Sequence, residues 1–179
     1  EKVCKHYADM GVKGFKVDFM DRDDQIVVDF YERMAATAAK FHLFVDFHGA
    51  YKPTGLSRTY PNVLNYEGVF GLEQCKWVSA DVDMVAYEVT IPFIRMLAGS
   101  MDFTQGAMKN AAKWCYAPVW SDPMSQGTRC RQLAEYVIFD APFAMLCDAP
   151  TAYLQEPECA EFIARVPTVW DETRVLDGM

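Results

Sequence analysis

The 179-residue sequence lacks the patterns of several familiar protein classes. Its six cysteines are spread along the chain without a CxxC pair, which excludes zinc knuckles and redox motifs. We expect most of them to be ordinary buried side chains, with one or two disulfides as the alternative. The chain has no GxSxG elbow, and its three histidines lie in dissimilar contexts. A serine-hydrolase site and a zinc site are therefore not expected.

Positive charge is also scarce. The chain has 17 Lys and Arg against 25 Asp and Glu, so its net charge is −8 and we expect no nucleic-acid partner. No apolar run is long enough to span a bilayer, and no signal-peptide pattern opens the chain. Because it starts in a helical pattern without an initiator Met, we expect an excerpt of a longer protein. What is present is a globular composition, 51% hydrophobic and 14% aromatic, which suffices for a sizeable core.

Short apolar segments alternate with segments of helical periodicity. The expected strands are 15–19, 42–49, 63–68, 100–104 and 143–148, and the expected helices are 1–10, 21–41, 80–98 and 128–140, with a further short helix near the C-terminus. This alternation predicts a parallel sheet with helices packed around it. Two α/β architectures fit: an open doubly wound sheet, or five of the eight units of a (β/α)8 TIM barrel.

The ends of the expected strands favour the barrel. An ionisable residue stands at or near the C-terminal end of each one: Asp18, His48, Glu67, Asp102 and Asp148. A barrel gathers such strand ends into one site. An open sheet would concentrate its ligand contacts at one switch point, and no glycine-rich phosphate loop marks such a point. We therefore predict a barrel, which this chain cannot close alone.

Asp18 is the first candidate for chemistry. It lies in the motif VDF, inside the strand pattern and too early to cap the next helix, whereas Asp23 and Asp24 suit that helix's first turn. An ionised carboxylate at a half-buried strand end costs free energy, so we favour a catalytic or ligand role. Lys16 shares its face because strand side chains alternate. Either a contact with sugar hydroxyls or a structural ion pair would explain Lys16.

Two glutamates form the second constellation. Glu67 ends a strand, and Glu73 follows six residues later, after a glycine-containing turn. Taken alone the pair would be surface acids, but with Asp18 it places carboxyl groups at the ends of two strands. Glycoside hydrolysis needs two such facing carboxyl groups. His48 fits a substrate hydrogen bond and a histidine satisfied by backbone groups equally well.

The remaining candidates have weaker signals. Asp46 is more often structural in this pattern, and we expect Asp102 and Asp148 to be helix caps rather than contacts at the rim of the site. Aromatic residues in or near loops suit the apolar face of a sugar ring, with loop packing as the alternative. They are Tyr51, Tyr60, Trp77, Trp114 and Trp120.

Three stretches together resemble glycoside hydrolase family 97, whose members are α-glucosidases and α-galactosidases. They are GVKGFKVDFMDRDDQ (11–25), VDFHGAYKPTGLSRTYPNVLNYEGVFGLE (45–73) and VPTVWDETRVLDG (166–178). The resemblance implies a (β/α)8 catalytic barrel between an N-terminal β-rich domain and a C-terminal β-sheet domain. Residues 1–168 would supply roughly strands 4 to 8, and residues 169–179 would begin the C-terminal domain. The rest of the parent chain would be the obligatory partner.

The residue after His48 distinguishes two branches of this family. In the inverting α-glucosidases a glutamate follows this histidine as general base, and no acid occupies the strand-4 position. Here Gly49 follows His48 and Asp18 is present, a pattern that resembles the retaining α-galactosidases. The resemblance then implies that Asp18 is the nucleophile, Glu73 the general acid/base and Lys16 a sugar contact.

Family members also bind calcium beside the site. Glu67 and Glu73 align with carboxylates attributed to that ion, and oxygen ligands suit a hard cation. The expected substrate is an oligosaccharide or another α-galactoside. The alternatives are an α-glucosidase of either stereochemistry and a non-catalytic carbohydrate-binding fragment. The resemblance also implies a periplasmic or secreted protein of a Gram-negative bacterium, because members of the family are typically found there.

Overall fold

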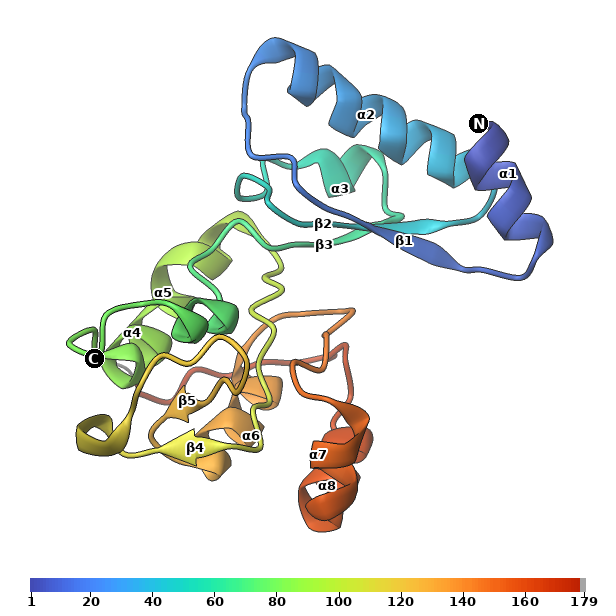
Figure 1. Ribbon diagram of the computed structural model, residues 1–179. Helices are drawn as coiled ribbons and strands as arrows, with labels where there is room; N and C mark the ends of the chain where they lie inside the picture. Colours follow the sequence, from blue (N-terminus) through green and yellow to red (C-terminus); the bar gives the residue numbers. More distant parts are fainter. Residues whose placement is uncertain (178–179) are drawn as a thin grey trace.

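The computed structural model describes residues 1–177, which form two lobes (Figure 1). The first lobe contains α1 (Lys2–Asp9), β1 (Gly14–Val17), α2 (Gln25–Lys40), β2 (Phe44–Phe47), α3 (Leu56–Thr59) and β3 (Val63–Tyr66). The second contains η1 (Leu72–Lys76), α4 (Met84–Thr90), α5 (Pro92–Arg95), η2 (Met96–Ala98), β4 (Asn110–Ala111), η3 (Lys113–Cys115), β5 (Ser125–Gln126), α6 (Arg129–Ile138), α7 (Pro150–Gln155) and α8 (Pro157–Arg165). Within residues 1–177, none of the helices has both the length and the apolar character that a membrane span needs.

The first lobe is a parallel sheet in the order β1-β2-β3, with α2 packed on one face (Figure 1). That face is apolar: Phe47 and Tyr66 are buried, and their rings lie 4.5 and 6.3 Å from the ring of Tyr31 in α2. Asp24 is the N-cap of α2, because its side chain accepts hydrogen bonds from two backbone N–H groups in the first turn of the helix. The expected parallel sheet with packed helices is confirmed, and Asp24 has the helix-starting role that its position predicts.

The opposite face of the sheet is polar although it is largely buried. The strand register places Lys16 beside Asp46 and Asp46 beside Asn65. Asp46 and Asn65 have no exposed surface. The second lobe covers this face, since the Asn65 side-chain amide donates to the backbone carbonyl of Phe143 at 2.9 Å. The polar face therefore lies between the sheet and the second lobe rather than toward solvent.

Among the described residues, no strand forms at 100–104 or at 143–148, so these two expectations are wrong. Asp102 donates its N–H to Tyr66 at 2.9 Å beside β3, but Thr104 has a positive φ of 58°, which ends the extended run before a ladder can form. Pro142 directly precedes the second segment and has no N–H to donate. The pair β4 and β5, which is parallel and two residues long, was not expected.

Helices agree better with the sequence pattern. The expected helix at 80–98 is divided into α4, α5 and η2, and Pro92 stands at the first position of α5, where its missing N–H has no cost. Residues 169–177 form no helix or strand, and residues 178–179 lie outside the described residues. The assignment of 169–179 to a further β-sheet domain therefore stays a prediction.

The cysteines differ from expectation. All six lie within the described residues and all are free, so the alternative of a disulfide does not hold there. Only Cys4 and Cys75 are buried, whereas Cys115, Cys130 and Cys147 are exposed and Cys159 is intermediate. The expectation that most of them are buried is wrong, because three lie in the second lobe's loops or on the outer face of a helix.

Arg95 joins the second lobe to the end of β3. Its side chain is buried, with 5% of the residue exposed, and its guanidinium donates only to backbone carbonyls. The acceptors, at 3.0 to 3.2 Å, are Tyr66, Glu67, Gly68, Gly99 and Ser100. Burial lowers the pKa of this guanidinium to about 10. Arg95 therefore fixes the backbone that carries Glu67.

Candidate active site

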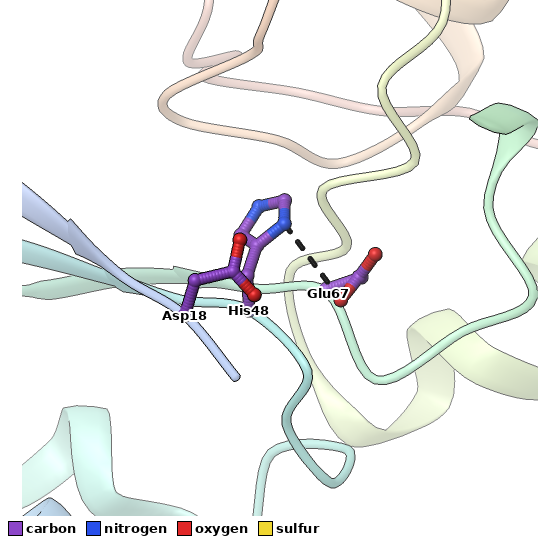
Figure 2. A group of neighbouring side chains, drawn as sticks. All are labelled: Asp18, His48 and Glu67. Carbon is purple, nitrogen blue, oxygen red and sulfur yellow. Dashed lines mark ion pairs between the residues drawn. The ribbon is translucent and has the colours of Figure 1, made fainter. Parts of the chain in front are cut away.

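Three ionisable side chains meet at the carboxyl edge of the sheet. Asp18 follows β1, His48 follows β2 and Glu67 follows β3. Their ligand atoms all lie within 4.8 Å of one another, and Figure 2 shows the three side chains converging from neighbouring strands. The prediction that strand ends gather these residues is confirmed for this part of the chain, because parallel strands end at the same edge.

The Asp18 carboxylate is held in its ionised form. One oxygen accepts from the backbone N–H of Phe19 at 2.7 Å, and the other lies 2.9 Å from the Lys16 ammonium. Burial raises the pKa of Asp18, but the hydrogen bonds and the charge of Lys16 outweigh it and hold the pKa below its usual value. About a third of the side chain, 31%, is exposed, so this carboxylate is both charged and accessible.

His48 is buried between carboxylates, which neither alternative from the sequence foresaw. Its Nε2 lies 2.7 Å from Asp102 and 3.3 Å from Asp46, and its Nδ1 lies 3.7 Å from Glu67. Burial disfavours the charged imidazolium, yet the hydrogen bonds and charges of Asp102 and Asp46 raise the pKa of His48 to about 10. At neutral pH the ring is therefore a buried cation that faces three acids.

Asp102 and Asp148 are not helix caps, so that expectation is wrong. Asp102 has no exposed surface, and its carboxylate accepts a hydrogen bond from Nε2 of the His48 cation. Asp148 accepts from the backbone N–H of Met108 at 2.6 Å, and the residue that precedes α7 is Ala149. Asp102 has apolar neighbours in sequence, as Asp18 has, and that signal could have identified it as a buried acid.

Glu67 is anchored by the loop that follows β2. Its Oε2 accepts from the backbone N–H of Gly49 at 2.6 Å, and 19% of its side chain is exposed. The same Oε2 faces the His48 cation, whose Nδ1 lies 3.7 Å away. The second lobe holds the backbone of Glu67 in place, because the Arg95 guanidinium donates to its carbonyl. The carboxylate is thus held in place while part of it stays open to solvent.

Glu73 lies on η1 and faces a cavity of about 210 Å³ between the lobes. Lys16 and Asp148 also line this cavity. Lys16, which pairs with Asp18, therefore lines the same cavity as Glu73. Glu73 is exposed and belongs to neither described cluster of candidate metal ligands. Its catalytic and metal roles stay predictions.

Two of the loop tyrosines pack in the first lobe. Tyr51 lies 4.6 Å from Tyr31 between ring centroids, and Tyr60 packs against the same core. Loop packing, the alternative considered for these residues, is confirmed for both. Trp77, Trp114 and Trp120 are exposed.

Gly49 permits a close approach of the Asp18 loop. It has a positive φ of 55°, and a Cβ built there would lie 3.1 Å from the backbone nitrogens of Phe19 and Met20. The loop is tied to this point, because Asp21 donates its N–H to the Gly49 carbonyl at 2.7 Å. Any side chain at this position would displace the residues next to Asp18.

We expect Gly49→Ala in the whole protein to cost about 1 kcal/mol more in unfolding free energy than Gly11→Ala. Gly11 also has a positive φ, 93°, but nothing lies within 4 Å of its Cβ position, so it isolates the backbone strain. Urea unfolding followed by tryptophan fluorescence measures the difference. Equal losses in the two variants would contradict the close approach.

Comparisons with known proteins show relatives of one kind. The family model described as Glycoside hydrolase 97 matches residues 1–69. A protein named "Retaining alpha-galactosidase" from Bacteroides thetaiotaomicron is 65% identical over 99% of this chain and 27% of its own length. A "Probable retaining alpha-galactosidase" from Streptomyces bingchenggensis is 33% identical over 94% of this chain and 24% of its own length. The chain thus spans about a quarter of the length of these curated relatives.

Solved structures agree with these relatives. A glycoside hydrolase family 97 enzyme from Pseudoalteromonas sp. strain K8, in complex with panose, superposes with a TM-score of 0.83 and 28% identity. The match covers 99% of this chain and 29% of that one. A beta-arabinopyranosidase crystal structure matches with a TM-score of 0.78 and 31% identity, over 99% of this chain and 28% of that one.

Proposed function

Because the chain belongs to glycoside hydrolase family 97, we propose that the whole protein is a glycosidase that cleaves terminal α-galactosides with retention of configuration. The observation that carries the proposal is Asp18, an ionised and accessible carboxylate at the end of a sheet strand. A relative named as a retaining alpha-galactosidase, 65% identical over this segment, supports the substrate class.

The proposed setting is a (β/α)8 barrel to which this chain contributes roughly strands 4 to 8. Three parallel strands with helices on one face support this arrangement, and so does the buried polar face opposite the helices. The free edge of β1 would then pair with a strand from the rest of the protein. Remaining strands and domains of the parent chain would complete the site.

In the first chemical step Asp18 attacks the anomeric carbon of the galactoside. A covalent bond forms between a carboxylate oxygen and that carbon while the bond to the leaving oxygen breaks. Glu73 gives its proton to the leaving oxygen, so that the leaving group departs as a neutral alcohol. Lys16 keeps Asp18 ionised until the attack and can contact a hydroxyl of the sugar.

In the second step the covalent intermediate is hydrolysed. Glu73, now ionised, takes a proton from a water molecule whose oxygen attacks the anomeric carbon. The ester bond breaks and Asp18 is released as a carboxylate. Two inversions at one carbon give net retention. His48, which is buried, would orient Glu67 and Asp18 by its charge rather than contact bulk solvent.

We also propose that Glu67 and Glu73 bind calcium. Glu67 is a partly exposed carboxylate with an anchored position, Glu73 is exposed, and oxygen donors of this kind fit a hard cation. Further oxygen ligands would have to come from water or from the rest of the protein, because calcium takes about 6 to 8. When bound, the ion would supply positive charge that keeps Glu67 ionised and makes the protonated Glu73 a stronger acid toward the leaving oxygen.

Proton NMR of the whole protein acting on p-nitrophenyl α-galactoside tests the proposal. We expect α-galactose as the first product, before mutarotation, because a nucleophilic Asp18 requires two displacements. Initial release of β-galactose would mean inversion, and Asp18 would lose its role. The same assay on p-nitrophenyl α-glucoside tests the alternative substrate, and no hydrolysis of either compound would favour a carbohydrate-binding protein.

A further inference from the structure

Two tryptophans of the second lobe stack on each other at the surface. The rings of Trp77 and Trp120 lie 5.0 Å apart between centroids and are inclined by 28°. The residues are 44% and 69% exposed, respectively. Trp77 donates its indole N–H to Gln74 at 2.6 Å, and the Lys76 ammonium lies 5.6 Å from the Trp120 ring centroid. The pair is therefore ordered by neighbours although water reaches it.

An ordered, exposed aromatic pair is unusual for a surface that has no ligand, because large apolar rings gain free energy by burial. Trp114 offers a contrast within the same lobe. It is 88% exposed, and no contact with another ring is found for it in residues 1–177. Both rings are partly open to solvent, and exposed indole rings suit contact with the C–H face of a pyranose ring.

Lys76 links the pair to the cavity that Glu73 lines, because it lines this cavity and its ammonium lies 5.6 Å from the Trp120 ring centroid. Glu73, Lys76 and Trp77 belong to η1 or directly follow it, and Lys76 lines the cavity together with Glu73. On the other side Pro123, three residues after Trp120, lines the same cavity. Both tryptophans are thus attached to the cavity wall by short stretches of chain.

We propose that the Trp77–Trp120 pair binds the sugar of the leaving group during glycoside cleavage. The inference rests on the proposed function, in which Glu73 protonates the leaving oxygen. The leaving group must then pass beside η1, which Trp77 directly follows and whose Lys76 lies over the Trp120 ring. The ligand is an uncharged pyranose attached to the galactosyl residue, held by contact of its C–H face with an indole ring.

The test compares two substrates of the whole protein that differ in the leaving group alone. α-Galactosyl fluoride releases a fluoride ion, which has no ring, whereas a galactosyl-α-1,6-glucose disaccharide releases a sugar. We expect Trp120→Ala to lower kcat/KM on the disaccharide about tenfold, as expected for the loss of an aromatic contact. Its kcat/KM on the fluoride should stay within about twofold of the wild-type value. Trp77→Ala should behave in the same way.

Two controls make the result specific. Trp114→Ala removes a more exposed tryptophan outside the pair and should leave kcat/KM on both substrates unaffected. Trp120→Phe keeps a ring and should recover most of the loss on the disaccharide. Equal losses on both substrates, or no loss on the disaccharide, would overturn the assignment of the pair. A wild-type protein that hydrolyses neither substrate would instead refute the proposed glycosidase activity itself.

Discussion

Replacing Asp18 by alanine in the whole protein is expected to lower kcat on p-nitrophenyl α-galactoside by about 10⁴-fold or more, as loss of a nucleophile does in other covalent enzymes. The carboxylate that would form the covalent bond is removed, and no other acid of the described cluster takes its place. Glu67 accepts from Gly49, and Asp102 is buried against His48. Steady-state kinetics with wild-type and variant proteins measure the loss.

Azide identifies the role of the lost carboxylate. In Asp18→Ala the small anion can occupy the vacated space, attack the anomeric carbon and restore turnover, with β-galactosyl azide as the product. Asp23→Asn is the matched control, because Asp23 is an exposed acid of the same loop and should retain full activity. An Asp18→Ala protein with near-normal turnover in the absence of azide would contradict the nucleophile assignment.

Replacing Arg95 by methionine is expected to lower the free energy of unfolding by about 4 kcal/mol. Methionine has a similar length but no donors, so carbonyls at the end of β3 and around Gly99 lose their partner in a buried place. Each buried acceptor left without a hydrogen bond costs roughly 1–3 kcal/mol, and some of these carbonyls can recover water. Chemical unfolding of the whole protein, followed by fluorescence, measures the change.

Two further variants separate geometry from charge. Arg95→Lys keeps the positive charge. An ammonium has only three protons at one point, however, and cannot reach all the carbonyls that lie around the planar guanidinium. We therefore expect Arg95→Lys to recover less than half of the lost unfolding free energy. Arg165→Met removes an exposed arginine that pairs with Glu161 within α8, and should change stability by about 0.5 kcal/mol or less. A small effect of Arg95→Met would show that water replaces the guanidinium.

Those parts of the site that depend on neighbours in sequence could be predicted. Alternation along a strand was enough to place Lys16 beside Asp18, and the ion pair is present at 2.9 Å. The ends of parallel strands share one edge, so Asp18, His48 and Glu67 could be expected together. Asp24 could be recognised as an early acid of α2 because capping is a local property.

Contacts between distant segments could not be predicted in this way. Asp102 and His48 are 54 residues apart, and although the barrel pattern places both at strand ends, nothing within either segment indicates that they pair directly. The apolar segments 100–104 and 143–148 have strand composition, but a ladder also needs a partner with free N–H and C=O groups in register. Asn65 instead binds Phe143 through its side chain. Partners of this kind are set by residues distant in sequence, not by the local composition.

The close packing at Gly49 also bears on how such a protein can change during evolution. The resemblance to glycoside hydrolase family 97 implies that its inverting branch has a glutamate after the residue equivalent to His48 and no acid at the position of Asp18. Here the loop behind Asp18 occupies the space that a side chain at position 49 would need. A side chain at position 49 would therefore require the loop behind Asp18 to shift. We therefore expect a lineage that exchanges one stereochemical outcome for the other to alter both segments, because a change at position 49 alone adds strain next to Asp18.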